Sequence, residues 1–386
     1  AADMDPAAPL PDYPRPALVR EHWVNLNGRW DYAIASRQAN RPAEWEGKIV
    51  VPFCAESQLS GVQRTVGPDR MLWYRRTFAA PVHRENERVL LHFGAVDWEA
   101  RVWVNHREVG VHRGGYDPFT LDITEALQEG ENELVVSVWD PTDAGPQPRG
   151  KQLRTPEGIW YTEVSGIWQT VWLEVVPEAY ITDVHAMGDP ATGELTVKVH
   201  AAAKASDEVS VEVLDGDVRV ASGNGGAGRP FTLTVPKAKA WGPGHPHLYI
   251  LRVALGKDRV TSYCAFRSVS WAADEHGVNR LLLNGEPVFH FGPLDQGWWP
   301  DGLYTASTDE ALRYDIEMTL AMGFNMARKH VTVEPERRYT WAERLGLMVW
   351  QDMPSGFVTG EREGVPKTDH ANIRRELQAV LEARDH

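Results

Sequence analysis

The residues best suited to chemistry stand in the last third of the chain, just after short apolar runs. They combine carboxylates, an amide, an arginine and a histidine, which can hydrogen-bond hydroxyl groups, with tryptophan rings, which can stack on an apolar face. This combination favours a polyhydroxylated ligand. We expect it to bind at Asp295, Gln296, Trp298, Trp299, Asp301, Arg328, His330 and Asp352, and at Trp160 from an earlier part of the chain.

An alternation of strands and helices must position these residues. After a hairpin that turns at Asn284-Gly285, the pattern predicts short strands at 289–292, 324–328 and 347–351, each followed by a helix, at 308–323, 334–345 and 371–384. Such alternation with short linkers is typical of parallel βα units. Because the carboxyl ends of the strands form the active face of a βα barrel, the residues should gather on one rim.

Only three such units fit into residues 275–386, whereas a complete (β/α)8 TIM barrel needs eight strands and about 250 residues. We therefore expect this region to be the truncated start of a TIM-barrel domain, with an open apolar edge. Each polar residue taken alone could instead belong to a structural ion pair or be a hydrogen-bonded core histidine. Clustering on one rim favours ligand binding.

Residues 1–178 show a different pattern, with short alternating segments rich in Val, Trp and Phe between Gly, Pro, Asn and Asp turns. This predicts an all-β jelly-roll sandwich. Two of its loops stand out, at 113–119 and at 140–152, the second too long for a simple hairpin. A functional role and domain–domain packing both remain open for them.

Residues 179–270 contain at least four short alternating strands within about 90 residues, which suits an immunoglobulin-like sandwich. The Gly-rich stretch 223–228 lacks the strand-then-helix context of a phosphate loop. We find no catalytic pattern here and expect a spacer, so the fold class is multidomain.

Composition narrows the function classes. The net charge is −14 with no basic patch, so nucleic acid is not an expected partner. No apolar run reaches 18 residues, so no membrane span is expected. Cys54 and Cys264, the only cysteines, lack a metal or redox spacing. The 16 tryptophans fit both sugar binding and sandwich cores. We expect no metal and no cofactor.

In order along the chain, its motifs resemble those of glycoside hydrolase family 2, which contains β-galactosidases, β-glucuronidases and β-mannosidases. The resemblance covers residues 72–174 and 241–354. Its motifs in the first region are Trp73-Tyr74-Arg75-Arg76-Thr77-Phe78, Trp103-Val104-Asn105, Gly114-Gly115-Tyr116-Asp117-Pro118-Phe119 and Ser165-Gly166-Ile167-Trp168. Later ones are Trp241-Gly242-Pro243, Leu283-Asn284-Gly285-Glu286-Pro287, Gly323-Phe324-Asn325 with Arg328, and Leu345-Gly346-Leu347-Met348-Val349-Trp350.

Three positions depart from the family pattern. His330 stands one residue closer to Arg328 than in the usual Arg-x-Ser-His, Asp352 replaces a usual Glu, and Ala265-Phe266-Arg267 replaces a usual Phe-Gly-x-Arg. These departures indicate a divergent subgroup.

The resemblance implies a retaining exo-β-glycosidase, β-galactosidase-like, in which one Glu protonates the leaving oxygen and a second attacks the anomeric carbon. The family's acid/base Glu follows an Asn, and residues 275–386 contain no Asn-Glu pair. We therefore expect both catalytic carboxylates to lie beyond His386, in a longer protein. The alternative is a non-catalytic carbohydrate-binding protein; a third idea is activity through Asp295, Asp301 or Asp352. The expected partner is a β-linked sugar, and a homo-oligomer is possible.

The sequence leaves the sugar and the compartment open. Residues 1–16 are rich in Ala and Pro and contain no intact signal peptide. We expect a periplasmic or secreted protein if a signal peptide was removed, and a cytoplasmic protein otherwise.

Overall fold

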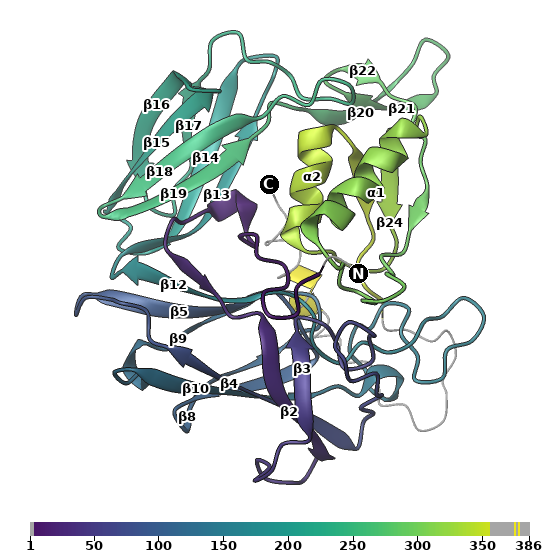
Figure 1. Cartoon of the computed structure of the whole chain (residues 1–386). Helices are drawn as coiled ribbons and strands as arrows, with labels where there is room; N and C mark the ends of the chain where they lie inside the picture. Colours follow the sequence, from purple (N-terminus) through teal and green to yellow (C-terminus); the bar gives the residue numbers. More distant parts are fainter. Residues whose placement is uncertain (1–3, 356–373, 376, 379–386) are drawn as a thin grey trace.

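The computed structural model describes residues 4–355, 374–375 and 377–378. Two β-sandwiches and a smaller α/β region make up this part of the chain, and the α/β region lies beside the second sandwich and against the first (Figure 1). The prediction of a multidomain, mainly β architecture is confirmed. None of the described helices is long and apolar enough to cross a membrane.

The first sandwich packs a four-stranded sheet against a six-stranded sheet. The first sheet consists of β1 (Trp23–Asn25), β12 (Val171–Pro177), β5 (Glu87–Phe93) and β9 (Phe119–Asp122). The second consists of β3 (Gly47–Val51), β2 (Gly28–Ser36), β4 (Arg70–Ala79), β10 (Glu131–Trp139), β7 (Glu99–Val104) and β8 (Arg107–Arg113). A short pair, β6 (Val96–Asp97) and β11 (Gly166–Ile167), and the 3-10 turns η2 (Thr124–Ala126) and η3 (Thr142–Ala144) complete it. A further 3-10 turn near the N-terminus, η1 (Pro16–Leu18), packs instead on the second sandwich, whose core contains Leu18. Its core is aliphatic and aromatic, with Trp30 fully buried.

The second sandwich also has two antiparallel sheets, whose strands alternate between buried and exposed residues as period-two patterning requires. One sheet contains β13 (Tyr180–Gly188), β14 (Glu194–Ala202) and β17 (Phe231–Thr234); the other contains β16 (Val218–Gly226), β15 (Glu208–Asp215), β18 (Tyr249–Leu255) and β19 (Asp258–Cys264). Cys264 lies in this core, whereas Cys54 lies between the first sandwich and the α/β region; both are free and buried.

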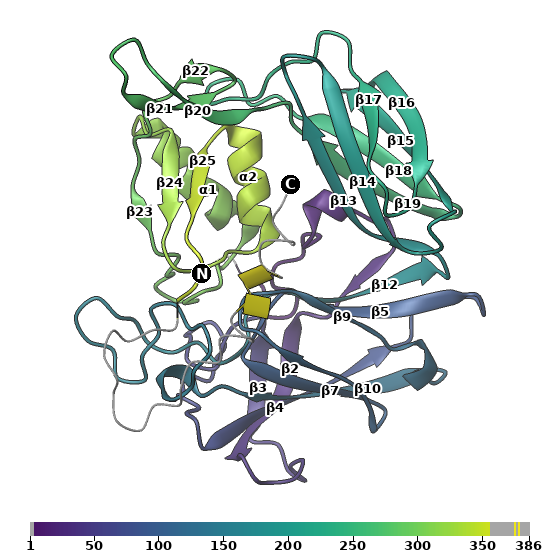
Figure 2. The ribbon, with the colours of Figure 1, turned by 180° about the vertical axis from the view of Figure 1, so that it is seen from behind.

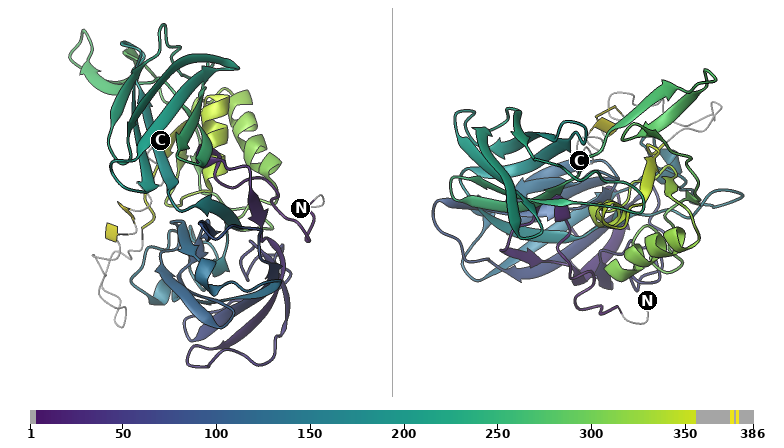
Figure 3. Two further views of the ribbon diagram at one scale, coloured as in Figure 1. Left: turned by 90° about the vertical axis from the view of Figure 1, so that its left-hand side faces the viewer. Right: turned by 90° about the horizontal axis from the view of Figure 1, so that it is seen from above.

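The third region opens with an antiparallel ribbon, β20 (Val269–Ala273), β21 (Asn279–Leu283) and β22 (Glu286–Pro287), which extends away from the body of the molecule (Figure 3). A parallel sheet follows, with β23 (Leu294–Asp295), β24 (Met326–Lys329) and β25 (Met348–Gln351) in that order (Figure 2). Helices α1 (Asp309–Ala321) and α2 (Glu336–Leu345) connect these strands and cover one face of the sheet.

The helix ends follow their sequence signals. Thr308 caps α1 by accepting a hydrogen bond from the Ala311 N–H at 3.2 Å, and Gly323, with a φ of +87°, follows the helix end. Gly346, at φ +83°, ends α2 in the left-handed conformation that favours glycine. The helix predicted at 371–384 lies outside the described residues except at 374, 375, 377 and 378, which are helical.

The strand predicted at 289–292 is wrong, because the first parallel strand begins at Leu294. Two local features explain the difference. The Asn325 side chain accepts the Phe291 N–H at 2.9 Å, in place of a backbone carbonyl, and Pro293 has no N–H to donate. The segment therefore runs beside β24 without a regular ladder, and Phe289 and Phe291 remain exposed.

Candidate functional site

The alternation of side chains along β24 divides the predicted site residues between two faces of the sheet. Arg328 is exposed on the face away from the helices, whereas Lys329, the next residue, is buried on the helix side. The predicted residues therefore form two neighbouring groups, and the prediction that they share one rim holds only in part.

The first group is Arg328, His330 and Asp352, which we call the strand-end cluster. Arg328 makes a bidentate ion pair with Asp352, with Nε–Oδ1 at 3.0 Å and a second nitrogen–Oδ2 distance of 2.9 Å. The His330 Nε2 lies 3.9 Å from the same carboxylate, and its Nδ1 is buried without a hydrogen-bond partner. Burial, followed by the nearby charge of Lys151, lowers the pKa of His330. A neutral imidazole beside a paired carboxylate suits hydrogen bonding to a hydroxyl.

The second group lines a cavity of about 470 Å³ between β23 and α1. Its members from the prediction are Asp295, Gln296, Trp298 and Trp299. The Trp298 ring stacks on Tyr161, with centroids 4.6 Å apart and an interplanar angle of 19°. The Gln296 Oε1 and the Trp299 Nε1 are buried without partners, so this cavity retains unused hydrogen-bonding capacity.

Asp295 is committed to a buried ion network and is not available to a ligand. Its Oδ2 lies 2.8 Å from the Lys329 Nζ and 3.2 Å from a guanidinium nitrogen of Arg338. Lys329 also pairs with the buried Glu334. Burial alone would raise the pKa of Asp295, but Lys329 and Arg338 outweigh it and hold the pKa below its usual value. This network was not predicted from the sequence, although alternation along β24 places Lys329 on the face opposite Arg328.

The two remaining predicted residues belong to neither group. The Asp301 carbonyl accepts the Leu59 N–H at 3.0 Å, which ties this loop to the first sandwich. Trp160 is half-buried in a loop of the first sandwich, with the Arg149 guanidinium 6.0 Å from its ring centroid.

The loop between residues 140 and 165 joins the first sandwich to the α/β region. Beneath it, Tyr116 and Trp168 pack with Tyr304 and Val333 in one buried cluster. The Tyr116 and Tyr304 hydroxyls are 3.1 Å apart. The predicted loop at 113–119 therefore serves packing through Tyr116, whereas the loop after Asp140 reaches the candidate site.

Buried acids support the base of this loop. The Ser165 hydroxyl donates to the Asp140 Oδ2 at 2.9 Å, the Thr142 hydroxyl contacts the Glu163 Oε2 at 3.1 Å, and the Ser165 N–H donates to the Glu56 Oε2 at 2.9 Å. Burial raises the pKa of Asp140 to about 6 and that of Glu163 to about 7.

The described residues contain no group of three or more His, Cys, Asp or Glu that could hold a metal ion.

We expect Glu163→Gln to remove a pH-dependent loss of stability. Because the pKa of Glu163 is about 7 in the folded protein and about 4.3 in an unfolded chain, the folded state binds this proton more tightly. The stabilisation is complete below about pH 4 and is lost as the pH rises through 7. Between pH 5 and pH 8, the melting temperature should therefore fall less in E163Q than in the unaltered chain. The control is Glu194→Gln, at an exposed position. A fall in melting temperature in E163Q as large as that of the unaltered chain would contradict the expectation.

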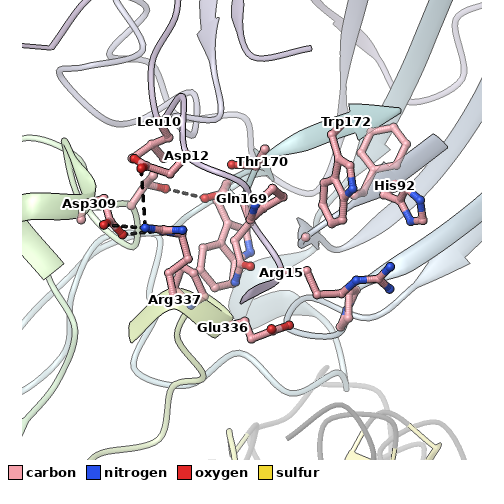
Figure 4. Close-up of a pocket in the computed structure, with 18 of the residues that line it drawn as sticks. Leu10, Asp12, Arg15, His92, Gln169, Thr170, Trp172, Asp309, Glu336 and Arg337 are labelled. Carbon is pink, nitrogen blue, oxygen red and sulfur yellow. Dashed lines mark hydrogen bonds and ion pairs between the residues drawn. The ribbon is translucent and has the colours of Figure 1, made fainter. Parts of the chain in front are cut away.

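A second cavity, of about 200 Å³, lies between the N-terminal segment, the first sandwich and the two helices. Arg337 crosses this junction (Figure 4): it pairs with Asp309 at 2.5 and 2.6 Å, lies 3.6 Å from Asp12, and donates to the Tyr13 carbonyl at 2.9 Å. None of the predicted site residues lines this cavity, and its contacts join the domains.

Two domain models of one family match the chain: "Glycosyl hydrolases family 2, sugar binding domain" at residues 23–177 and "Glycosyl hydrolases family 2" at residues 179–267. The chain belongs to glycoside hydrolase family 2. This confirms the family predicted from the motifs.

Three curated relatives each share less than 30% sequence identity with the chain. A putative β-glucuronidase of Formosa agariphila is 28% identical over 86% of this chain and 41% of its own length. A β-galactosidase of Thermoanaerobacter pseudethanolicus is 25% identical, with coverages of 81% and 43%, and a β-glucuronidase of Paenibacillus borealis is 29% identical, with coverages of 90% and 61%. The chain spans about half the length of these curated relatives.

Among solved structures, a Ruminococcus gnavus β-glucuronidase superposes with a TM-score of 0.78 at 20% identity, covering 97% of this chain and 66% of that one. A Faecalibacterium prausnitzii β-glucuronidase gives a TM-score of 0.72 at 24% identity, with coverages of 89% and 61%. These similarities show a shared fold.

Proposed function

We propose that this chain forms the accessory domains and part of the sugar-binding rim of a retaining exo-β-glycosidase, and that β23, β24 and β25 are the first strands of its (β/α)8 barrel. The observation that carries the proposal is the strand-end cluster. Arg328, His330 and Asp352 stand just after or at the carboxyl ends of β24 and β25, where βα barrels bind their ligands. Family membership supplies the reaction class.

The favoured substrate is a β-glucuronide. Most of the named relatives are β-glucuronidases, which supports an acidic sugar more than the β-galactoside expected from the sequence. Retaining hydrolysis needs two carboxyl groups about 5–5.5 Å apart on either side of the scissile bond. Asp352 is paired with Arg328 and Asp295 with Lys329, so neither provides a free carboxylate for that role. We assign them to binding and support.

Assay of the natural gene product that contains this chain tests the proposal. We expect 4-nitrophenyl β-D-glucuronide to be hydrolysed with a kcat/KM at least tenfold above that of the β-galactoside and β-mannoside. Arg328→Ala should lower kcat/KM by about tenfold or more, because a hydrogen bond to a charged group contributes about 1.5–3 kcal/mol. Arg219→Ala is the matched control, since Arg219 forms an exposed ion pair with Glu212 at 2.8 Å on the second sandwich.

The alternative is a carbohydrate-binding protein without hydrolytic activity, which the match to the family's sugar-binding domain at residues 23–177 favours. Saturable binding of glucuronate with no turnover of any of the three aryl glycosides by the gene product would establish it. Preferential cleavage of the β-galactoside would contradict the proposed substrate but retain the reaction class.

A further inference from the structure

A loop of the first sandwich inserts between the ends of two strands of the α/β region. The N–H groups of Arg149 and Gly150 donate to the Ser355 carbonyl at 3.1 and 2.8 Å, just after β25. On the other side, a Cβ placed on Gly150 would lie 2.6 Å from the Val331 carbonyl, just after β24. Gly150 itself has a φ of +58°. Only glycine combines this backbone conformation with such a close approach.

The far end of the same loop is fixed by a second set of contacts. The Tyr161 N–H donates to the Lys151 carbonyl at 2.9 Å, and the Leu153 N–H donates to the Tyr161 carbonyl at 2.8 Å. The Tyr161 ring then stacks on Trp298. Residues 149–161, which we call the bridging loop, are therefore held against both groups of candidate site residues.

Lys151 is the charged residue that the bridging loop brings to the strand-end cluster. It is half-buried and directly follows Gly150, whose added Cβ would lie 2.6 Å from the carbonyl of Val331, the residue after His330. Its charge also contributes to the lowered pKa of His330. Among the described residues, no carboxylate forms an ion pair with Lys151. Asp352, the acid of the cluster, is engaged with Arg328 in bidentate geometry. Among the described residues, Lys151 and the cluster together contain two cations, one carboxylate and a neutral imidazole, and so carry net positive charge in a protein whose net charge is −14.

We propose that Lys151, supplied by the first sandwich, is a specificity-determining residue that recognises the carboxylate of an acidic sugar bound at the strand-end cluster. The inference rests on the proposed function and adds to it a residue outside the α/β region. A half-buried ammonium without a protein counter-ion is a strong partner for a carboxylate, and a hydroxymethyl group in the same place would leave its charge uncompensated.

The test compares Lys151→Met, Lys151→Arg and the unaltered gene product on 4-nitrophenyl β-D-glucuronide and 4-nitrophenyl β-D-glucoside, which differ only in the carboxylate. We expect the ratio of the two kcat/KM values to fall at least tenfold in K151M and to recover in part in K151R. Lys257→Met, at an exposed position of the second sandwich, should leave the ratio unchanged. An equal fall on both substrates in K151M would overturn the inference and leave the proposed function intact. Failure of the unaltered protein to cleave either substrate would overturn the proposed function itself.

A second readout uses the 386-residue chain. Because the charge of Lys151 contributes to the lowered pKa of His330, with Asp352 and Arg328 as the other charges that act on it, K151M should raise that pKa in an NMR titration of the imidazole. Adding D-glucuronate should shift the His330 resonance in the unaltered chain and shift it less in K151M. An unchanged His330 pKa in K151M would place Lys151 away from the cluster and overturn the inference.

Discussion

Replacing Lys329 with methionine should lower the free energy of unfolding of the α/β region by about 3–5 kcal/mol, because it removes the cation that pairs with the buried Glu334. The Lys329 side chain is only 3% exposed and pairs with Asp295 at 2.8 Å and with Glu334. Arg338 can still neutralise Asp295, at 3.2 Å, whereas Glu334 loses the cation that pairs with its carboxylate. Burial already raises the pKa of Glu334, and losing Lys329 raises it further.

The double variant Lys329→Met/Glu334→Leu separates the lost pair from a simple packing defect. Replacing both partners of a buried ion pair with apolar groups is often neutral, so the double variant should recover most of the loss. Chemical denaturation combined with hydrogen exchange at β23, β24 and β25 measures both effects. Arg88→Met, which breaks the exposed Arg88–Asp122 pair, is the control and should change stability little. A double variant less stable than K329M would contradict the expectation.

Gly150→Ala should displace the bridging loop, with a stability loss of about 2–4 kcal/mol. A left-handed conformation costs an alanine roughly 1–2 kcal/mol. Its Cβ would also lie 2.6 Å from the Val331 carbonyl and 2.9 Å from the Tyr116 hydroxyl, inside the packed junction between domains. Activity should fall along with stability, because Lys151 and Tyr161 move with the loop.

The same loop offers a control with almost identical backbone geometry. Gly158 has a φ of +57°, but nothing lies within 4 Å of a Cβ added there. Gly158→Ala should therefore lose only the conformational part, about 1–2 kcal/mol, and retain the selectivity for an acidic substrate. Thermal melting and the glucuronide-to-glucoside kcat/KM ratio measure the two consequences. Equal effects of G150A and G158A would show that the close approach to Val331 is unimportant.

Local signals in the sequence predicted the elements of the fold well where one residue decides the outcome. Thr308 and Gly346 mark helix ends because a cap and a left-handed glycine act within one turn, and Asn284-Gly285 marks the hairpin. The strand expected at 289–292 failed because a side chain distant in sequence, Asn325, takes the hydrogen bond that a ladder would need.

The candidate site was harder to predict, because it depends on contacts across domains. Arg328 and His330 lie at the end of β24 and Asp352 follows β25, so their proximity could be inferred from a parallel sheet. That Asp295 would be engaged by Lys329 depends on which face each side chain takes. The role of Lys151 could not be inferred, since the length of its loop left both a functional role and domain–domain packing open.

The insertion of Gly150 between Val331 and Ser355 also bears on protein engineering. Here the first sandwich contributes Tyr161 to the lining of the cavity beside β23, so a chimera joined near residue 178 would divide the proposed binding site between two parents. Recombination that keeps residues 140–165 together with the strand ends they contact would preserve the pocket, whereas a boundary chosen from the sequence alone would divide it.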